Sequence, residues 1–282
     1  MKTHKKVCSV TAAIIVLSSL VTGANAALNV TSTTSYGFFN ESDGFFSDLD
    51  SNSSNTGASV SISGNAYDSN YRFSATGMAS ASAFSKRLRA QASGALNFED
   101  GSEIGSFVDP TPDFYSARGT ASFTETLSYG GTATNYSSKY ILNFTGTIIG
   151  DASVAIALTH AGNPVQFWSF SSPGTYNETL ISEAFVHGQS PQDFSLTLES
   201  QIDLSTDDSL YPIPNSGNAD FGNTLEVVGI ELRDNDTGIL LTGDSVMGES
   251  GSTYAITQIP EPSSALLLGL GCACLAFRRS GR

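Results

Sequence analysis

Apolar and polar residues alternate one by one along much of this chain, and this period of two constrains the fold more than any other feature. Alternation places successive side chains on opposite faces of a strand, so that one face can be buried while the other meets water. Short Gly-, Pro-, Asn- and Asp-containing turns, as at 150–151 and 235–238, separate the runs. The pattern predicts an all-β fold, an antiparallel β-sandwich of jelly-roll-like order. The clearest alternating runs are 58–62, 79–83, 121–127, 140–149, 154–158, 165–170, 194–202 and 225–232.

Composition excludes several classes of protein. Charged residues make up only 14% of the chain, against roughly 25% in an ordinary globular domain, which argues against a long helix or coiled coil. The net charge of −14 makes nucleic acid a poor partner, because neutralising phosphates requires a basic face. All three cysteines lie outside 27–259, so the body offers no disulfide, thiolate metal site or cysteine nucleophile.

The N-terminus has the three parts of a secretory signal. Three lysines are followed by an apolar stretch over 10–21 and then by Ala24-Asn25-Ala26. Ala24 and Ala26 are the small residues that signal peptidase requires at positions −3 and −1 before its cleavage site. The apolar stretch has only about a dozen residues, too few to span a bilayer, which needs about 20. We therefore predict a signal peptide over 1–26, cleaved between Ala26 and Ala27.

The C-terminus has the order of a membrane-sorting tail. Pro260-Glu261-Pro262 is followed by an apolar run, and the chain closes on the basic residues Arg278, Arg279 and Arg282. The run predicts a membrane helix over about 263–277, with the arginines on the cytoplasmic side. Cys272 and Cys274 in this helix are interpreted as small apolar residues, with acylation or pairing as the alternative.

This tail resembles the PEP-CTERM sorting signal of Gram-negative bacteria, also called the ice-binding protein C-terminal domain. The resemblance implies a precursor held in the inner membrane until an exosortase processes it near Pro260, Glu261 and Pro262. The alternative is an ordinary anchor with a chance Pro-Glu-Pro. The stretches 117–127 and 217–230 also resemble the β-rich bodies of uncharacterised PEP-CTERM proteins, which implies a β-sandwich without known catalytic residues.

These features divide the chain into four parts. The signal peptide (1–26) is followed by a segment over 27–55 that is rich in Ser, Thr, Asn and Asp and is predicted to be irregular, docking through its paired phenylalanines. A β-sandwich body over 56–258 comes next, and the sorting tail occupies 259–282.

Candidate sites in the body are few. His160 and His187 are its only histidines, each expected in a turn, and no motif joins them to a nucleophile, so no catalytic residue is predicted. Trp168 is expected in the core. Asp234 and Asp236 form a partial Asp-x-Asp rhythm, which makes calcium a candidate ligand. The stronger interpretation of these two acids is a hairpin turn, and no cofactor is predicted.

These observations predict an exported, non-enzymatic protein of the cell surface or extracellular matrix. Its expected partners are signal peptidase, an exosortase, the inner membrane for a time, and exopolysaccharide. Two rivals stay open, a secreted polysaccharide-active hydrolase and a carbohydrate- or calcium-binding module. The hydrolase would need a pair of carboxylates, and the adjacent acids Asp207-Asp208 and Glu99-Asp100 are available for one.

Overall fold

A computed structural model describes the backbone of residues 27–37, 45–54, 58–68, 73–98, 114–205 and 216–259. The predicted signal peptide and the predicted membrane helix lie outside these ranges. Within the ranges, no helix is long and apolar enough to cross a membrane. The strands are β1 Ala27–Gly37, β2 Phe45–Ser54, β3 Ala58–Asp68, β4 Phe73–Phe84, β5 Arg87–Phe98, β6 Phe114–Gly130, β7 Asn135–Gly150, β8 Ala152–His160, β9 Gln166–Phe170, β10 Gly174–Ile181, β11 Phe185–Gly188, β12 Gln192–Ser205, β13 Ser216–Asp234, β14 Ser245–Gly248 and β15 Thr253–Tyr254.

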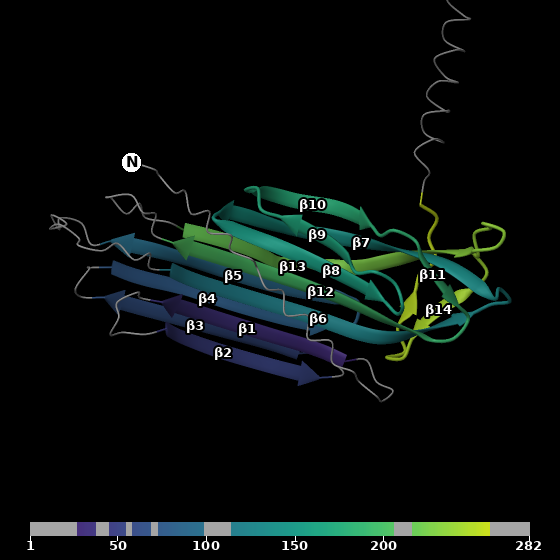
Figure 1. The fold of residues 1–282 in the computed structure, drawn as a ribbon, viewed down its shortest axis with the longest axis horizontal. Helices are drawn as coiled ribbons and strands as arrows, with labels where there is room; N and C mark the ends of the chain where they lie inside the picture. Colours follow the sequence, from purple (N-terminus) through teal and green to yellow (C-terminus); the bar gives the residue numbers. More distant parts are fainter. Residues whose placement is uncertain are drawn as a thin grey trace, which may run out of the picture.

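The strands form two sheets that lie face to face (Figure 1). The first sheet has the order β15-β14-β6-β12-β8-β9, with β1 also beside β6 and β2 beside β1. The second has the order β10-β7-β13-β5-β4-β3, with β11 also beside β7. Every pairing between these strands is antiparallel, and β6 and β12 of the first sheet lie over β4 and β5 of the second. The prediction of an all-β antiparallel body is confirmed, whereas a jelly-roll-like order stays a prediction.

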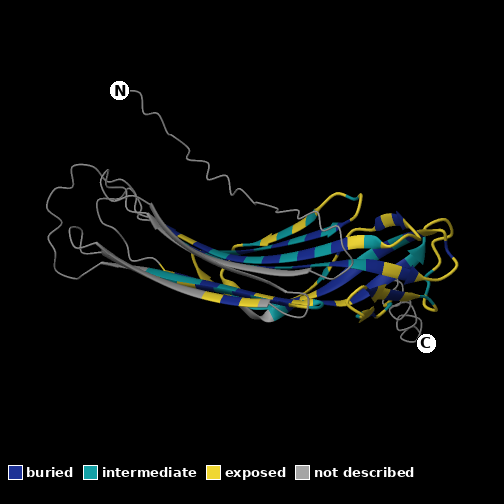
Figure 2. Ribbon diagram, turned by 90° about the horizontal axis from the view of Figure 1, so that it is seen from below, coloured by how far each residue is buried: buried dark blue, intermediate teal, exposed yellow. Residues whose placement is uncertain are grey.

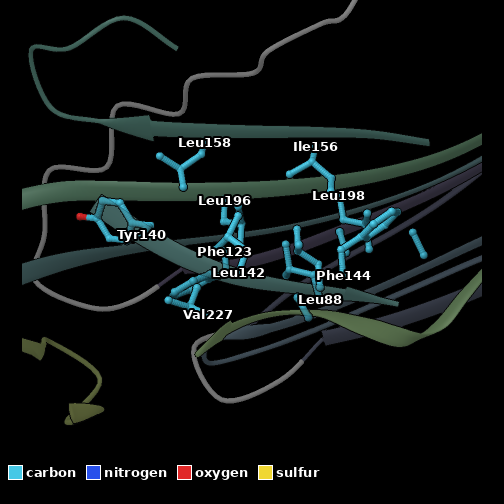
Figure 3. Packing of buried hydrophobic residues seen from close by; sticks show 14 of the residues in the cluster. Leu88, Phe123, Tyr140, Leu142, Phe144, Ile156, Leu158, Leu196, Leu198 and Val227 are labelled. Atoms are coloured by element: carbon cyan, nitrogen blue, oxygen red, sulfur yellow. The ribbon is translucent and has the colours of Figure 1, made fainter. Parts of the chain in front are cut away.

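The alternation in the sequence becomes an alternation of burial. Along the described strands, buried residues alternate with half-buried and exposed ones (Figure 2). In β8, buried and half-buried residues alternate along the whole strand. The core between the sheets is built from large residues such as Phe123, Tyr140 and Phe144 (Figure 3). Tyr140 stacks on Phe194 with ring centroids 4.4 Å apart, and half-buried Trp168 packs against this core.

One part of the core is built from small residues instead. β4 contributes Ala79, Ala81 and Ala83, and β6 contributes Ala117 and Ala121. Between the two β6 alanines lies Gly119, where an added Cβ would come within 2.4 Å of the Ser80 carbonyl oxygen and 2.7 Å of that of Gln91. Here the first sheet lies against the backbone of the second, closer than a side chain would permit.

The prediction of an irregular segment over 27–55 is wrong. β1 pairs with β2 from Leu28↔Ser54 to Gly37↔Phe45, and on its other side with β6 from Ala27↔Thr124 to Gly37↔Phe114. Ladder hydrogen bonds join backbone groups, which Ser, Thr and Asn supply as well as apolar residues do, so a polar strand can be held by its neighbours. The described parts of this segment, β1 and β2, therefore belong to the first sheet.

Candidate functional site

His160 and His187 lie side by side in the core, and not in turns as expected. His160 is the last residue of β8 and His187 lies in β11, and they are only 1% and 7% exposed. Their ring centroids are 4.6 Å apart. Three tyrosines complete what we call the His–Tyr cluster: Tyr129 lies 4.4 Å from His187, Tyr136 stacks on the same ring at 5.7 Å, and Tyr140 lies 5.9 Å from His160.

Hydrogen bonds fix the ring of His187. Its Nδ1 lies 3.0 Å from the Gly188 carbonyl oxygen, which can only accept, so Nδ1 donates. In the neutral ring Nε2 is then the acceptor, and the Ser138 hydroxyl 2.7 Å away donates to it. His160 Nε2 is bonded to the Tyr129 hydroxyl at 3.1 Å, but its Nδ1 is buried without a partner among the described residues.

Burial keeps the cluster uncharged. Burial in the first place, together with the neighbouring His187, lowers the pKa of His160 to about 4. Burial also lowers the pKa of His187 and raises the pKa of Tyr129 to about 12. At neutral pH both histidines are therefore neutral and Tyr129 is protonated. The arrangement joins β6, β7, β8 and β11 by stacking and hydrogen bonds.

Two surface hollows of about 250 and 260 Å³ lie away from this cluster. The described residues include no group of three or more His, Cys, Asp or Glu that could hold a metal ion. Each hollow is lined mainly by polar side chains: the first by Ser80, Ser82, Arg89 and Gln91 with two alanines, and the second by Asp151, Ser153, Ser171, Gln201 and Asp203 with Gly150 and Ala152.

Asp234 and Asp236 lie together at the turn after β13. Asp234 Oδ1 accepts hydrogen bonds from the backbone N–H groups of Asp236 at 2.8 Å and of Thr237 at 3.0 Å. The Asp236 carboxylate accepts from the Asn135 side-chain amide at 3.2 Å. Both carboxylates thus take part in the turn, as the hairpin interpretation expects. Calcium binding at this place stays a prediction.

The last described residues, 253–259, form what we call the C-terminal strap. Tyr254 is 5% exposed, and its hydroxyl donates to the carboxylate of Glu125, which is itself 1% exposed. The Ser250 backbone N–H donates to the same carboxylate at 3.0 Å. Burial and then Glu125 raise the pKa of Tyr254 well above its usual range. A buried acid of β6 therefore holds the start of the strap.

A second buried acid holds the end of the strap. Glu231 of β13 is 2% exposed, and it accepts a hydrogen bond from the Ile259 backbone N–H at 2.8 Å and another from Arg233 Nε at 2.9 Å. Burial alone would raise the pKa of Glu231, but Arg233, the Ile259 amide and Lys139 together lower it. The carboxylate is therefore charged, and each of its two oxygens accepts a hydrogen bond. Sequence reasoning found neither Glu125 nor Glu231.

Replacing Glu125 by Ala should lower the free energy of unfolding by roughly 2 kcal/mol. The substitution leaves the buried Tyr254 hydroxyl without its acceptor, and such a group costs about 1–3 kcal/mol when unpaired. The N–H of the exposed Ser250 can bond to water instead. Urea denaturation of the purified protein measures the change. Glu226→Ala is the control, because the ion pair of Glu226 with Arg87 at 3.2 Å is exposed and is worth at most about 1 kcal/mol. Equal losses in both variants would contradict the prediction.

The comparisons with known proteins concern the region that begins at the end of the strap. A family model described as the PEP-CTERM protein-sorting motif matches residues 258–280. No curated protein and no solved structure matches the chain. The resemblance of the tail is thereby confirmed, and the match contains Pro260, Glu261 and Pro262. This motif implies export with exosortase-type sorting, a membrane-anchored precursor, and an exosortase as processing partner.

Proposed function

We propose that the protein is an exported, non-enzymatic β-sandwich protein of a Gram-negative bacterium, displayed at the cell surface or in the extracellular matrix after exosortase processing. The single observation that carries the proposal is the sorting motif over 258–280, which begins on the last residues docked against the two-sheet body. In this proposal a signal peptide over 1–26 exports the body. A membrane helix over about 263–277 then holds it, with the three arginines in the cytoplasm.

The outward face of the first sheet supports a place in a hydrated, polar environment. Its middle strands carry half-buried or exposed hydroxyl and carboxylate side chains in register. Three cross-strand bonds join them: Thr120 to Glu199 at 3.4 Å, Thr124 to Ser195 at 3.2 Å, and Thr126 to Asp193 at 2.9 Å. Short side chains that already bond to one another lose little freedom when water or polysaccharide hydroxyls approach.

The position of the histidines supports a role without catalysis. A histidine acts as a general base from a place where its ring can reach a substrate proton. The rings of His160 and His187 instead stack between buried aromatic side chains. Their stacking and hydrogen bonds fit a structural contribution to the core.

Deleting 260–282 should release the body from the membrane in soluble form, because the last docked residue is Ile259. Replacing Pro260, Glu261 and Pro262 together by Ala should leave the chain membrane-bound and unprocessed. Cell fractionation and the mass of the exported protein measure both results. The matched control replaces the adjacent Ser263 and Ser264 by Ala and should be processed at the normal rate. Loss of the tail at the normal rate from the triple-alanine chain would contradict the proposal.

A further inference from the structure

The folded body reaches the sorting motif without a linker. The matched residues begin at 258, and Ile259 is still hydrogen-bonded to Glu231. If the predicted membrane helix begins at Ser263, only 260–262 connect the body to the bilayer. Three extended residues reach about 10 Å. In that arrangement a membrane peptidase that acts at Pro260-Glu261-Pro262 must work within about 10 Å of the docked Ile259.

The strap is held by backbone hydrogen bonds as well as by its side chains. The Ala255 carbonyl accepts from the Ile230 N–H at 2.9 Å, and the Thr257 N–H donates to the Ile230 carbonyl at 3.0 Å. Lys86 Nζ donates to the Thr253 carbonyl at 2.7 Å. Each of these bonds must break before the strap can leave the body.

Glu231 supplies the last attachment before the motif. Its two carboxylate oxygens divide their bonds, Oε2 accepting from the Ile259 N–H and Oε1 from Arg233. The ion pair with Arg233 orients the buried carboxylate toward the strap, and the salt-bridge donor is itself only 28% exposed. Ile259 also precedes proline, which favours the extended conformation that it needs in order to meet Glu231.

We propose that the strap gates C-terminal processing: while Glu231 holds Ile259, the segment before Pro260 is closed to the exosortase. A peptidase acts on backbone that is free of other hydrogen bonds, so a docked segment is cut only from the fraction of molecules in which it has opened. The rate of processing then follows the opening of the end of the strap and not the unfolding of the whole body. This inference rests on the proposed function. It adds that the folded body itself regulates the rate at which the tail is processed.

The experiment follows loss of the tail from the full-length chain by pulse–chase in cells that contain the exosortase. Glu231→Ala should speed processing about tenfold, the change expected when one hydrogen bond to a charged group is lost. A second variant inserts six Gly and Ser residues between Ile259 and Pro260. It leaves every described contact in place, gives the exosortase a free segment of about 20 Å, and should be processed at least as fast as Glu231→Ala.

Ile148→Ala is the matched control for lost stability. Ile148 is 1% exposed and lies near the C-terminal end of β7, where it pairs with Gly174 of β10 and Ala219 of β13. This variant should lower the melting temperature yet keep the rate of processing within twofold of the original. Acceleration by Ile148→Ala equal to that by Glu231→Ala would overturn the gate, because global unfolding would then explain the rate.

The remaining outcomes separate the gate from the proposed function. If the unaltered chain is processed, and the Glu231→Ala chain and the chain with the insertion are processed at the same rate, the gate is overturned and the proposed function stands. If every chain keeps its tail, the proposed function is overturned and the gate with it. Faster processing in both altered chains, with Ile148→Ala unchanged, supports both.

Discussion

Replacing Gly119 by Val should lower the free energy of unfolding by more than about 3 kcal/mol, or prevent folding altogether. The added Cβ would meet the carbonyl oxygens of Ser80 at 2.4 Å and Gln91 at 2.7 Å. Both are backbone atoms of the facing sheet, so neither can rotate away as a flexible side chain would. Relief requires the sheets to separate, which would open the alanine contacts on either side of Gly119, and overpacking of this kind belongs to the most destabilising substitutions. Urea denaturation followed by tyrosine fluorescence measures the loss.

Gly243→Val is the control for this prediction. An added Cβ at Gly243 meets nothing within 4 Å, so the substitution changes the residue type without a steric conflict. We expect a change within about 0.5 kcal/mol there, as for other surface substitutions. A Gly119→Val protein as stable as the Gly243→Val protein would contradict the close approach of the two sheets.

The sequence located the strands in which apolar or small side chains alternate with polar ones, because this alternation shows which side chains are buried. The alternation over 154–158 lies in β8, where buried and half-buried residues alternate, and the small-residue alternation over 79–83 lies in β4. Alternation is a local property, because each residue's face follows from that of its neighbour. The class of fold could therefore be predicted without knowing which strands pair.

The features that sequence reasoning missed depend on partners distant in the chain. β1 is polar throughout much of its length and is a strand because β2 and β6 lie on either side of it. His160 and His187 meet because β8 and β11 bring their ends together from different sheets. No local pattern in the sequence specifies such a meeting.

Glu231 was missed for a related reason. In β13 the side chain of Glu226 points outward and that of Val227 points inward. The pairing register then shifts between Val227 and Gly229. After this bulge Ile230 and Leu232 continue the core-facing side, so Glu231 points to the opposite side of the strand. It is buried there in contact with Ile259 of the strap and with Arg233. The burial of Glu231 therefore depends on a contact with residues near 259, which no local pattern around 231 shows.

The candidate processing site was the easiest part to recognise because its signal is short and contiguous. Pro260-Glu261-Pro262, the apolar run and the arginines follow one another within 23 residues, and the family match covers most of them. The task of the body has no comparable contiguous signal. Its chemistry-bearing residues are spread over strands that only the fold assembles.

The stability of the protein should fall as the pH drops from 6.5 toward 4, because the His–Tyr cluster excludes protonated histidine. The folded-state pKa of His160 is lowered to about 4, while the unfolded chain binds this proton near pH 6.5. The contribution of His160 is therefore fully present above pH 6.5 and is lost progressively as the pH falls toward the folded-state pKa. The difference corresponds to roughly 3 kcal/mol, and His187 changes stability in the same direction because its pKa is also lowered.

Urea midpoints at pH 7, 5.5 and 4.5 measure this loss, and a variant in which both histidines are Phe isolates it from the titration of carboxylates. Phe keeps the stacking area in the cluster but has no proton to bind, so the loss of stability between pH 7 and 4.5 should be smaller by most of those 3 kcal/mol. The variant should also be less stable than the original at pH 7, because the hydroxyls of Tyr129 and Ser138 lose their ring-nitrogen partners. If both proteins lost stability with falling pH along the same curve, the cluster would have to accept protonated histidine, and its burial in the core would be contradicted.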